Sequence, residues 1–325
     1  MVGSSYIPVA EERDDSFPIW VIDGETGTGK TYTYVNFPYE SGLVFSFDGQ
    51  VKRILNQFPE RKPHWRVIDA LRYYDVGESV ITHSAERTHD YIRQVLRCYD
   101  TDPDVRSILR SNGVPASEFH DPVEAVVFDG FQMLSEVEEM RMRGRNKLGP
   151  FEGFSNRGLW KSRRLGIREL VRAAERAALK AVIVTTYPQR VDVVKDGVLI
   201  ETRSPPNWYD IIEKESGLWL RNEKDTDVVK GQDKFYVSVK KSRFRSFLQG
   251  KRYAVPYGST FTDIIGKTAF FDLENVGRPP PLPSDLAALP ADARIRESDE
   301  GADAPVGEGT EEDELNALMS GHGDS

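Results

Sequence analysis

The chain has 325 residues, of which 39% are hydrophobic, enough for one large or two modest domains with a real core. No run approaches the roughly 18 apolar residues of a membrane span, and the acidic N-terminus does not resemble a signal peptide. The single cysteine, Cys98, excludes an internal disulfide and a cysteine metal cluster. We therefore expect an intracellular protein that is not inserted in a membrane.

The net charge of −9 is unevenly distributed along the chain. Residues 281–325 carry 12 acidic and two basic residues, which leaves the preceding 280 residues close to neutral. A near-neutral core can present a basic face to nucleic acid while the tail stays acidic.

The first predicted elements surround a glycine-rich loop. Residues 1–16 are expected to form a flexible N-terminal arm. The apolar run at 17–22 predicts a buried strand, and residues 32–37 can begin a helix that Pro38 stops. Between them lies GETGTGKT at 24–31, which fits the pattern G-x-x-x-x-G-K-[ST]. Strand, loop and helix in this order predict a phosphate-binding loop.

The residue types of this loop match its expected chemistry. Glycines let the backbone N–H groups point inward at phosphate oxygens, and the helix start adds a partial positive charge. Lys30 would reach the β- and γ-phosphates, and the Thr31 hydroxyl would be a ligand of Mg²⁺. The residues expected to contact the nucleotide are Gly24, Glu25, Thr26, Gly27, Thr28, Gly29, Lys30, Thr31 and Tyr32.

Two further apolar strands end in a carboxylate. Residues 43–47 are followed by Asp48, and residues 124–128 are followed by Asp129. A strand that is apolar throughout is buried on both faces, and its terminal carboxylate emerges at the carboxyl edge of the sheet. Asp129 therefore fits a Walker B aspartate that holds Mg²⁺, usually through water. Residues 65–69 predict another strand, and residues 70–122 a helical insertion.

The rest of the chain alternates between loops and strands. A helix is predicted at 131–140, then a basic, glycine-rich loop with several Phe residues, then an amphipathic helix at 159–180. Residues 181–186 form another apolar strand, 195–197 a hairpin turn, and 217–221 and 235–240 two antiparallel strands. The folded core is thus expected to span 17–275, and the acidic segment 276–325, with its prolines at 279–283, is expected to be a disordered tail.

Over residues 17–272 the chain resembles the RecA-fold P-loop ATPases, in particular the phage-type RecA-like recombination ATPases, and more distantly RadA, KaiC and DnaB cores. The resemblance rests on GETGTGKT at 24–31, VFSFDG at 44–49, VVFDG at 126–130, VIVTTYPQ at 182–189 and VKKSRF at 239–244. It implies an α/β fold with a mostly parallel central sheet flanked by helices and followed by C-terminal antiparallel strands. It also implies ATP and Mg²⁺ as cofactors, and the cytoplasm of a prokaryotic or phage-infected cell.

The resemblance further implies roles in hydrolysis. Asp48 occupies the place of the carboxylate that polarises the attacking water, where the family more often has Glu. Gln189 is the favoured sensor of the γ-phosphate, with Thr185 and Thr186 as alternatives. Lys241 and Arg243 satisfy a K-x-R signature that reaches the nucleotide of the next subunit. The residues expected to act in catalysis are therefore Lys30, Asp48, Gln189, Lys241 and Arg243, in a homo-oligomeric ring or filament with ATP between subunits.

RecA-like recombinases bind single-stranded DNA through two mobile loops, whose positions correspond here to residues 141–164 and 190–208. Lys and Arg side chains of the first loop would pair with DNA phosphates, and its aromatic residues would stack on nucleobases. The predicted DNA-binding residues are Arg141, Arg143, Arg145, Lys147, Arg157, Lys161, Arg163 and Arg164. The acidic tail would compete with DNA for these basic side chains, or it would recruit a single-strand-binding or replication protein.

The leading interpretation is thus a DNA-stimulated ATPase of the recombinase or annealing type. A hexameric helicase or packaging motor on the same core is the first alternative. A P-loop kinase of small molecules is a second, with the insertion at 70–122 as its lid or acceptor pocket. A third is an assembly protein that ATP holds together with negligible turnover.

Overall fold

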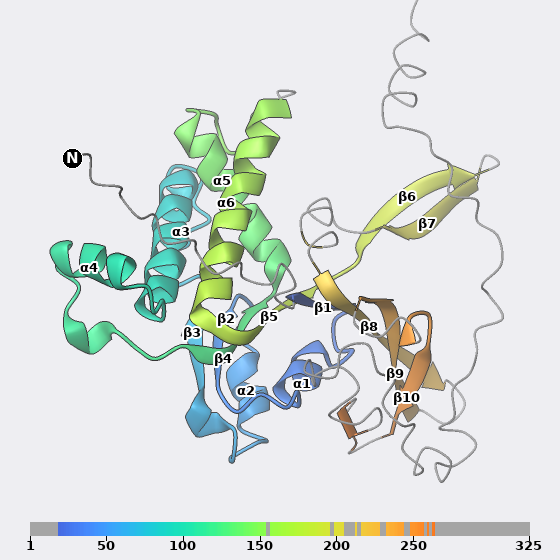
Figure 1. Cartoon of the computed structure of the whole chain (residues 1–325). Helices are drawn as coiled ribbons and strands as arrows, with labels where there is room; N and C mark the ends of the chain where they lie inside the picture. Colours follow the sequence, from blue (N-terminus) through green and yellow to red (C-terminus); the bar gives the residue numbers. More distant parts are fainter. Residues whose placement is uncertain are drawn as a thin grey trace, which may run out of the picture.

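The computed structural model describes residues 19–153, 157–195, 198–204, 212, 216–227, 232–243, 248–256, 259 and 262–263. The expected N-terminal arm and acidic tail lie outside these residues. The described strands form an eight-stranded sheet in the order β10-β9-β8-β1-β5-β4-β2-β3 and a separate β6-β7 pair (Figure 1). Their bounds are β1 Ile19–Gly24, β2 Gly42–Ser46, β3 Trp65–Asp69, β4 Val123–Asp129, β5 Ala178–Thr186, β6 Gln189–Lys195, β7 Val198–Ser204, β8 Ser216–Asp227, β9 Gln232–Ser242 and β10 Arg252–Val255.

The large sheet is parallel from β3 through β2, β4, β5 and β1 to β8. Strands β9 and β10 continue it with antiparallel pairing. Strand β5 lies between β1, which leads into the glycine-rich loop, and β4, which ends at Asp129. The predicted α/β fold class, with a mostly parallel central sheet flanked by helices and followed by C-terminal antiparallel strands, is confirmed.

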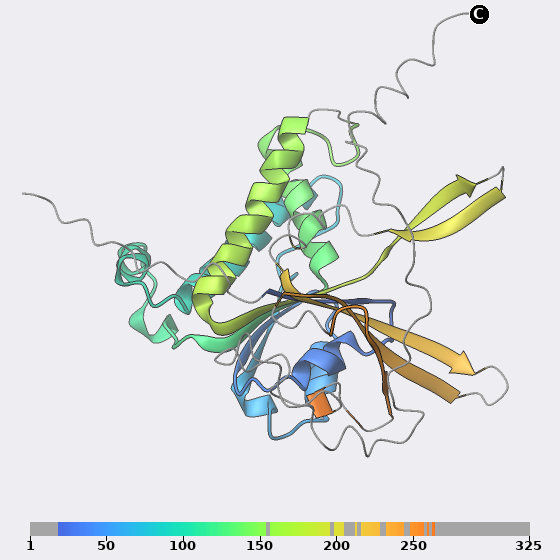
Figure 2. The ribbon, with the colours of Figure 1, turned by 45° about the vertical axis from the view of Figure 1, so that its right-hand side comes forward.

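Helices cover the two faces of the sheet and bury two separate apolar clusters (Figures 1 and 2). One face carries α1 and α2, and the other carries α3, α5 and α6. The bounds are α1 Lys30–Val35, α2 Val51–Leu55, α3 Ile81–Cys98, α4 Pro103–Ser111, α5 Phe131–Arg145 and α6 Arg157–Ala177, with short 3-10 turns at Lys62–His64 and Ala116–Glu118. Among the described helices, none combines the length and apolar character needed to cross a membrane.

The predicted helical insertion at 70–122 contains α3, α4 and the second 3-10 turn. Helix α3 buries Ile81, Ala85, Ile92 and Leu96 at helical spacing, and it packs on α5 and α6. The side chain of Asp102 caps α4 by accepting a hydrogen bond from the backbone N–H of Asp104, and Pro103 occupies the first turn. The insertion therefore thickens one face of the sheet.

The bounds of several elements differ from the prediction, and helices α5 and α6 matter most for the basic stretch. Helix α5 runs on to Arg145, so the start of the basic stretch predicted as a loop is helical. Helix α6 begins at Arg157 and ends at Ala177, and residues 178–180 already belong to β5. The helix prediction stopped at residue 140 because arginines interrupt the apolar pattern there, yet tertiary packing buries several of them. The predicted hairpin is present, with Lys195 of β6 opposite Val198 of β7.

Candidate active site

The glycine-rich loop lies at the carboxyl end of β1 and leads directly into α1. Gly24, Gly27 and Gly29 have φ angles of +152°, +77° and +84°, a region that residues with a Cβ rarely adopt. A Cβ at Gly24 would also lie 2.4 Å from the carbonyl oxygen of Asn222 in β8. The loop thus has the local backbone conformation that the motif predicts, at the sheet edge where α/β proteins bind ligands.

Lys30 is the first residue of α1, and its side chain folds back over the loop. Its Nζ donates hydrogen bonds to the carbonyl oxygens of Gly24 (2.8 Å) and Glu25 (2.9 Å). Only 7% of the residue is exposed. Burial lowers the pKa of Lys30 to about 8, because the loss of solvation outweighs the opposing attraction of Asp129 and Asp23. A buried cation thus faces the inside of the loop.

Asp129 is the centre of the polar contacts next to the loop. Its Oδ2 accepts hydrogen bonds from the hydroxyls of Thr31 (3.1 Å) and Tyr34 (3.0 Å). Its Oδ1 accepts one from Thr185 (2.5 Å), whose own oxygen accepts from the backbone N–H of Gly130 (2.9 Å). The predicted pair of Thr31 and Asp129 is therefore brought together across 98 residues of sequence.

The donor set fits a magnesium ion. Hydroxyl and carboxylate oxygens are hard ligands of the kind that Mg²⁺ prefers, and Thr31 and Asp129 present one each within 3.1 Å of each other. Burial raises the pKa of Asp129 above its ordinary value, since a carboxylate that is 2% exposed is poorly solvated. A cation at this point would relieve that cost.

Asp48 lies at the same edge of the sheet, in the turn after β2. The neighbouring backbone N–H of Phe47 donates to the carbonyl oxygen of Asp129 (3.0 Å), which ties this turn to the end of β4. Asp48 is exposed, and its Oδ1 accepts a hydrogen bond from the backbone N–H of Gln50 (3.0 Å). After burial, the negative charge of Asp48 is a further cause of the raised pKa of Tyr34 and of Asp129. The structure thus places this carboxylate beside the loop and open to solvent.

The end of β5 holds the predicted γ-phosphate sensors. Thr185 and Thr186 are buried, and Thr185 is committed to Asp129. Gln189 opens β6, but its side chain lies outside the described part of the structure, so its role stays a prediction. Between them, the ring of Tyr187 lies 3.7 Å from Nζ of Lys30. No pattern in the sequence indicated Tyr187, because its contact depends on β1 and β5 being neighbours.

Strand β8 supplies a second group of contacts that the sequence did not predict. The side-chain amide of Asn222 donates to the hydroxyl of Thr33 (2.7 Å) and to the carbonyl oxygen of Thr28 (3.3 Å). Arg221 donates hydrogen bonds to both oxygens of the buried carboxylate of Asp23 near the end of β1, from Nε to Oδ1 and from Nη2 to Oδ2. A cavity of about 350 Å³ lies between the loop and residues 221–225 of β8. These residues support the loop from the side opposite Asp129.

Lys241 and Arg243 lie toward the other end of the sheet. Strand β8 runs parallel to β1, with Ser216 opposite Ile19, and antiparallel β9 brings Lys241 opposite Trp219. Nζ of Lys241 lies 3.4 Å from the hydroxyl of Ser216. Through β8, Lys241 is level with Val21 in the middle of β1, and its side chain turns back toward Ser216, which is level with Ile19 and away from the glycine-rich loop.

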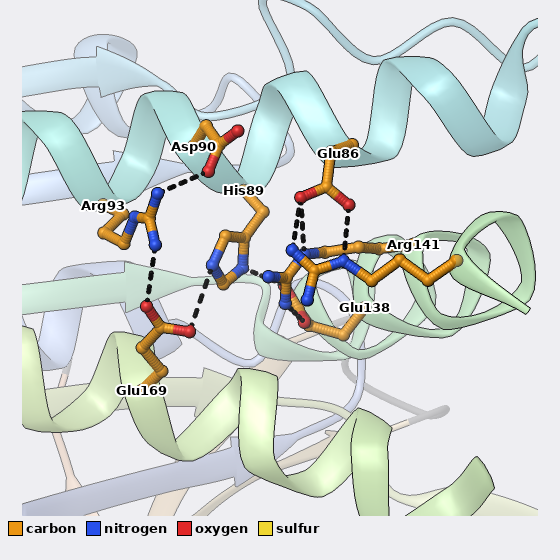
Figure 3. Close-up of polar contacts among 8 residues, drawn as sticks. Glu86, His89, Asp90, Arg93, Glu138, Arg141 and Glu169 are labelled. Atoms are coloured by element: carbon orange, nitrogen blue, oxygen red, sulfur yellow. Dashed lines mark hydrogen bonds and ion pairs between the residues drawn. The ribbon is translucent and has the colours of Figure 1, made fainter.

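The basic residues predicted to bind DNA divide into two groups, and those of the first group are buried. Arg141 is 6% exposed and pairs with Glu138 (3.0 Å) and Glu86 (3.3 Å), as Figure 3 shows. Arg143 pairs with Glu139 and donates to the carbonyl oxygens of Gly149 and Glu152. Arg163 also contacts Glu139 and packs on the ring of Trp160. These three arginines hold α5, α6 and the following loop together, and in this structure they are not open to a DNA phosphate.

The second group faces solvent. Lys147, Lys161 and Arg164 are exposed, while Arg145 is 53% exposed and pairs with Glu86. The side chain of Arg157 lies outside the described residues. Phe151, in the same loop, is 79% exposed. Of the residues predicted to bind DNA, Arg145, Lys147, Lys161 and Arg164 therefore remain candidates, together with the exposed ring of Phe151.

Comparison with protein-family models and with curated proteins finds no match. Among solved structures, the chain is similar to a KaiC-like protein of the hyperthermophilic archaeon Pyrococcus horikoshii. The two share 14% sequence identity with a TM-score of 0.35, over 75% of this chain and 87% of that one. So distant a likeness decides neither an activity nor a partner. The geometry of the glycine-rich loop and the position of Asp129 are therefore the basis for the candidate phosphate-binding and magnesium-binding site.

Proposed function

We propose that this protein binds and hydrolyses ATP as a RecA-like homo-oligomer and that single-stranded DNA stimulates the hydrolysis. One observation carries the proposal. The ammonium of Lys30 is buried inside a glycine-rich loop whose neighbouring Thr31 contacts Asp129 at the carboxyl edge of a parallel sheet. Triphosphate and a divalent cation are the ligands that this combination of charges fits.

In the proposed reaction, Thr31 and Asp129 would hold Mg²⁺, which supplies positive charge to the β- and γ-phosphate oxygens. The backbone N–H groups of the loop and the ammonium of Lys30 bind the same oxygens and orient them. Asp48, exposed beside the loop, orients a water for attack on the γ-phosphorus and accepts its proton late. Its side chain is one methylene shorter than Glu, so the water must approach the turn after β2 closely.

The position of Lys241 and Arg243 supports hydrolysis between subunits. The contact of Lys241 with Ser216 directs its side chain toward the start of β8, and the backbone of Arg243 contacts Gly217 there, away from the loop of their own chain. A neighbouring copy stacked head to tail would present these cations to the γ-phosphate, where they stabilise charge in the transition state. A ring and a filament both satisfy this geometry.

The exposed basic side chains of the loop after α5 and of the start of α6 support binding of single-stranded DNA. Lys147, Lys161 and Arg164 present positive charge to solvent, and Phe151 offers a ring for stacking on a base. A motor on the same core would use the same features, and strand unwinding distinguishes it from a recombinase. The kinase alternative receives less support, because α3 of the insertion packs on α5 and α6 rather than over the loop.

The experiment that tests the proposal is a measurement of ATP hydrolysis with and without single-stranded DNA. We expect hydrolysis that requires Mg²⁺, rises with DNA and disappears in Lys30→Ala. Asp48→Asn should bind ATP but hydrolyse it at least about 10²-fold more slowly, as expected for loss of a general base. Unchanged hydrolysis in Asp48→Asn would show that this carboxylate is not the base.

DNA stimulation is tested with a matched pair of variants. The double variant Lys161→Ala and Arg164→Ala removes two exposed basic side chains from α6. Lys52→Ala removes an exposed basic side chain from α2, on the other face of the sheet. We expect the first to lose DNA stimulation and keep basal hydrolysis, and the second to change neither. A chain that hydrolyses ATP without any response to nucleic acid would favour an assembly protein or a kinase.

A further inference from the structure

Tyr187 occupies the junction between the candidate active site and the β6-β7 hairpin. It follows the last residue of β5, and β6 begins two residues later (Figure 1). Its backbone N–H donates to the side-chain oxygen of Gln132 in α5 (3.2 Å). Burial raises the pKa of its hydroxyl, and the nearby side chain of Thr26 in the glycine-rich loop opposes that rise. The backbone contact thus anchors the residue beside the loop.

The face of this ring covers the ammonium of Lys30, with Nζ 3.7 Å from the ring centroid. The same ammonium donates to the carbonyl oxygens of Gly24 and Glu25. A lysine side chain has four rotatable bonds and loses much freedom when it is held in one place. The negative face of an aromatic ring attracts a cation without forming a directional bond, so it restrains Nζ while the ammonium can still turn its N–H groups.

We propose that Tyr187 is a positioning residue for Lys30, which it holds over the glycine-rich loop in the place where the ammonium meets phosphate. The inference rests on the proposed function, because it assigns Lys30 to phosphate binding. It adds a residue from the end of β5 to a site otherwise built from the loop, α1 and the end of β4. It also means that the chain segment entering the β6-β7 hairpin is in direct contact with the phosphate-binding lysine.

A double-mutant cycle with a non-hydrolysable ATP analogue tests the proposal. Tyr187→Leu keeps apolar bulk but removes the π face, and we expect its affinity for the analogue to fall by about 2- to 30-fold, the range of a cation–π contact. Tyr187→Phe keeps the ring and should lose less. In a Lys30→Met background, Tyr187→Leu should cause no further loss, because the cation it positions is absent.

A second readout needs no nucleotide. The rate at which an amine-acylating reagent modifies Lys30, followed by mass spectrometry, should rise in Tyr187→Leu and change little in Tyr187→Phe. Modification of the exposed Lys52 serves as the internal control. If wild-type protein binds no ATP analogue, the proposed function fails, while the acylation rates still decide whether Tyr187 restrains Lys30.

Three results would overturn the positioning role. These are an unchanged or tighter affinity in Tyr187→Leu, an equal loss in the Lys30→Met background, or an acylation rate of Lys30 that the substitution does not alter. A structural role alone would give an equal loss in both backgrounds. Thermal unfolding of each variant identifies any that fails to fold, and Tyr187→Met, a second apolar side chain without a ring, then replaces Tyr187→Leu in the cycle.

Discussion

At the scale of single residues, the site is organised around one buried carboxylate. Asp129 accepts hydrogen bonds from Thr31, Tyr34 and Thr185, so that its negative charge is compensated although it is almost inaccessible to water. Two of the three donors come from α1 and the third from β5. The carboxylate therefore aligns the glycine-rich loop with the neighbouring strand, besides any part it takes in holding a metal.

Thr185→Val tests this alignment. The substitution keeps the shape of the side chain but removes a hydroxyl that bridges Asp129 and the backbone N–H of Gly130. We expect a loss of about 2–6 kcal/mol in the free energy of unfolding, because two buried polar groups lose their partner at about 1–3 kcal/mol each. Urea unfolding measures the loss.

Thr186→Val is the matched control for that experiment. Thr186 is equally buried, but its hydroxyl makes only a 3.4 Å contact with the carbonyl oxygen of Tyr187. We expect it to cost less than about 1 kcal/mol. Equal losses for the two variants would mean that burial of a hydroxyl, and not the bridge to Asp129, determines the cost.

The affinity for phosphate ligands should depend on pH through Lys30. Burial lowers its pKa to about 8, so in the free protein the ammonium is present below that pH and is lost above it. A neutral amine does not attract phosphate, so affinity for an ATP analogue should fall above pH 8, by up to about tenfold per pH unit. Calorimetric titration between about pH 7 and pH 9.5 measures this.

Lys30→Arg provides the comparison, because a guanidinium stays charged throughout this range. Its affinity, whatever its value at neutral pH, should be nearly independent of pH up to about 9.5. The same decline in both proteins would assign the pH dependence to a group other than Lys30.

At the scale of elements, helices α3, α5 and α6 are joined by a polar network centred on the buried side chains of His89, Glu138 and Arg141. Figure 3 shows His89 of α3 between Glu138 of α5 and Glu169 of α6, with Nδ1 2.5 Å from the first carboxylate and Nε2 3.5 Å from the second. Only the shorter contact is a hydrogen bond. Arg141 completes the pairing of Glu138. Since α5 starts directly after Asp129, this network fixes the helix that leads from the candidate active site to the exposed basic loop.

Gly166 lets α6 approach this network. A Cβ at this position would lie 1.9 Å from a carboxylate oxygen of Glu138 and 2.8 Å from a guanidinium nitrogen of Arg141. Gly166→Ala should therefore destabilise the protein by about 2–4 kcal/mol, because it disturbs a buried ion pair. Helix propensity alone would give the opposite sign, a gain of up to about 1 kcal/mol.

Leu165→Ala is the control for Gly166→Ala, because it changes a neighbouring residue in the same turn of α6. Leu165 is 64% exposed, so its truncation should alter the free energy of unfolding by less than about 0.5 kcal/mol. Thermal or urea unfolding compares the two variants. A stabilised Gly166→Ala protein would show that α6 does not pack on Glu138 as described.

At the scale of the whole molecule, the two sets of cations predicted to act in hydrolysis lie at opposite edges of one sheet. Lys30 is at the carboxyl edge of β1, whereas Lys241 and Arg243 contact Ser216 and Gly217 toward its amino edge. A rigid sheet cannot bring them together within one chain. If both sets act on one nucleotide, two copies must supply them.

Mixing two inactive variants tests this arrangement. Lys30→Ala lacks the phosphate-binding lysine, and Arg243→Ala lacks the cation offered to a neighbour, so each alone should hydrolyse ATP poorly. In mixed oligomers, about one site in four would combine an intact loop with an intact Arg243 by random assortment. We expect ATP hydrolysis to reappear on mixing. A mixture as inactive as its components would indicate that Arg243 does not act between subunits.

The sequence by itself determined the features whose physics is local. The conformation of the glycine-rich loop follows from where its glycines stand, and the apolar runs before Asp48 and Asp129 predict buried strands with carboxylates at one edge. The hairpin at 189–204 follows from its turn. The parallel sheet follows from apolar strands separated by helices, because such strands need cover on both faces.

Only the tertiary structure decided which side chains meet. Nothing local to Tyr34 indicates its contact with Asp129, and nothing local to Tyr187 or Asn222 indicates the loop, since these contacts arise from strand order and join residues 95 to 194 positions apart. The same holds for the basic stretch, where Arg141 and Arg143 resemble Lys147 and Arg145 in sequence. Packing of α5 against α3 and α6 buries the first two, which pair with Glu138 and Glu139, and only the fold separates arginines that hold helices together from those that face solvent.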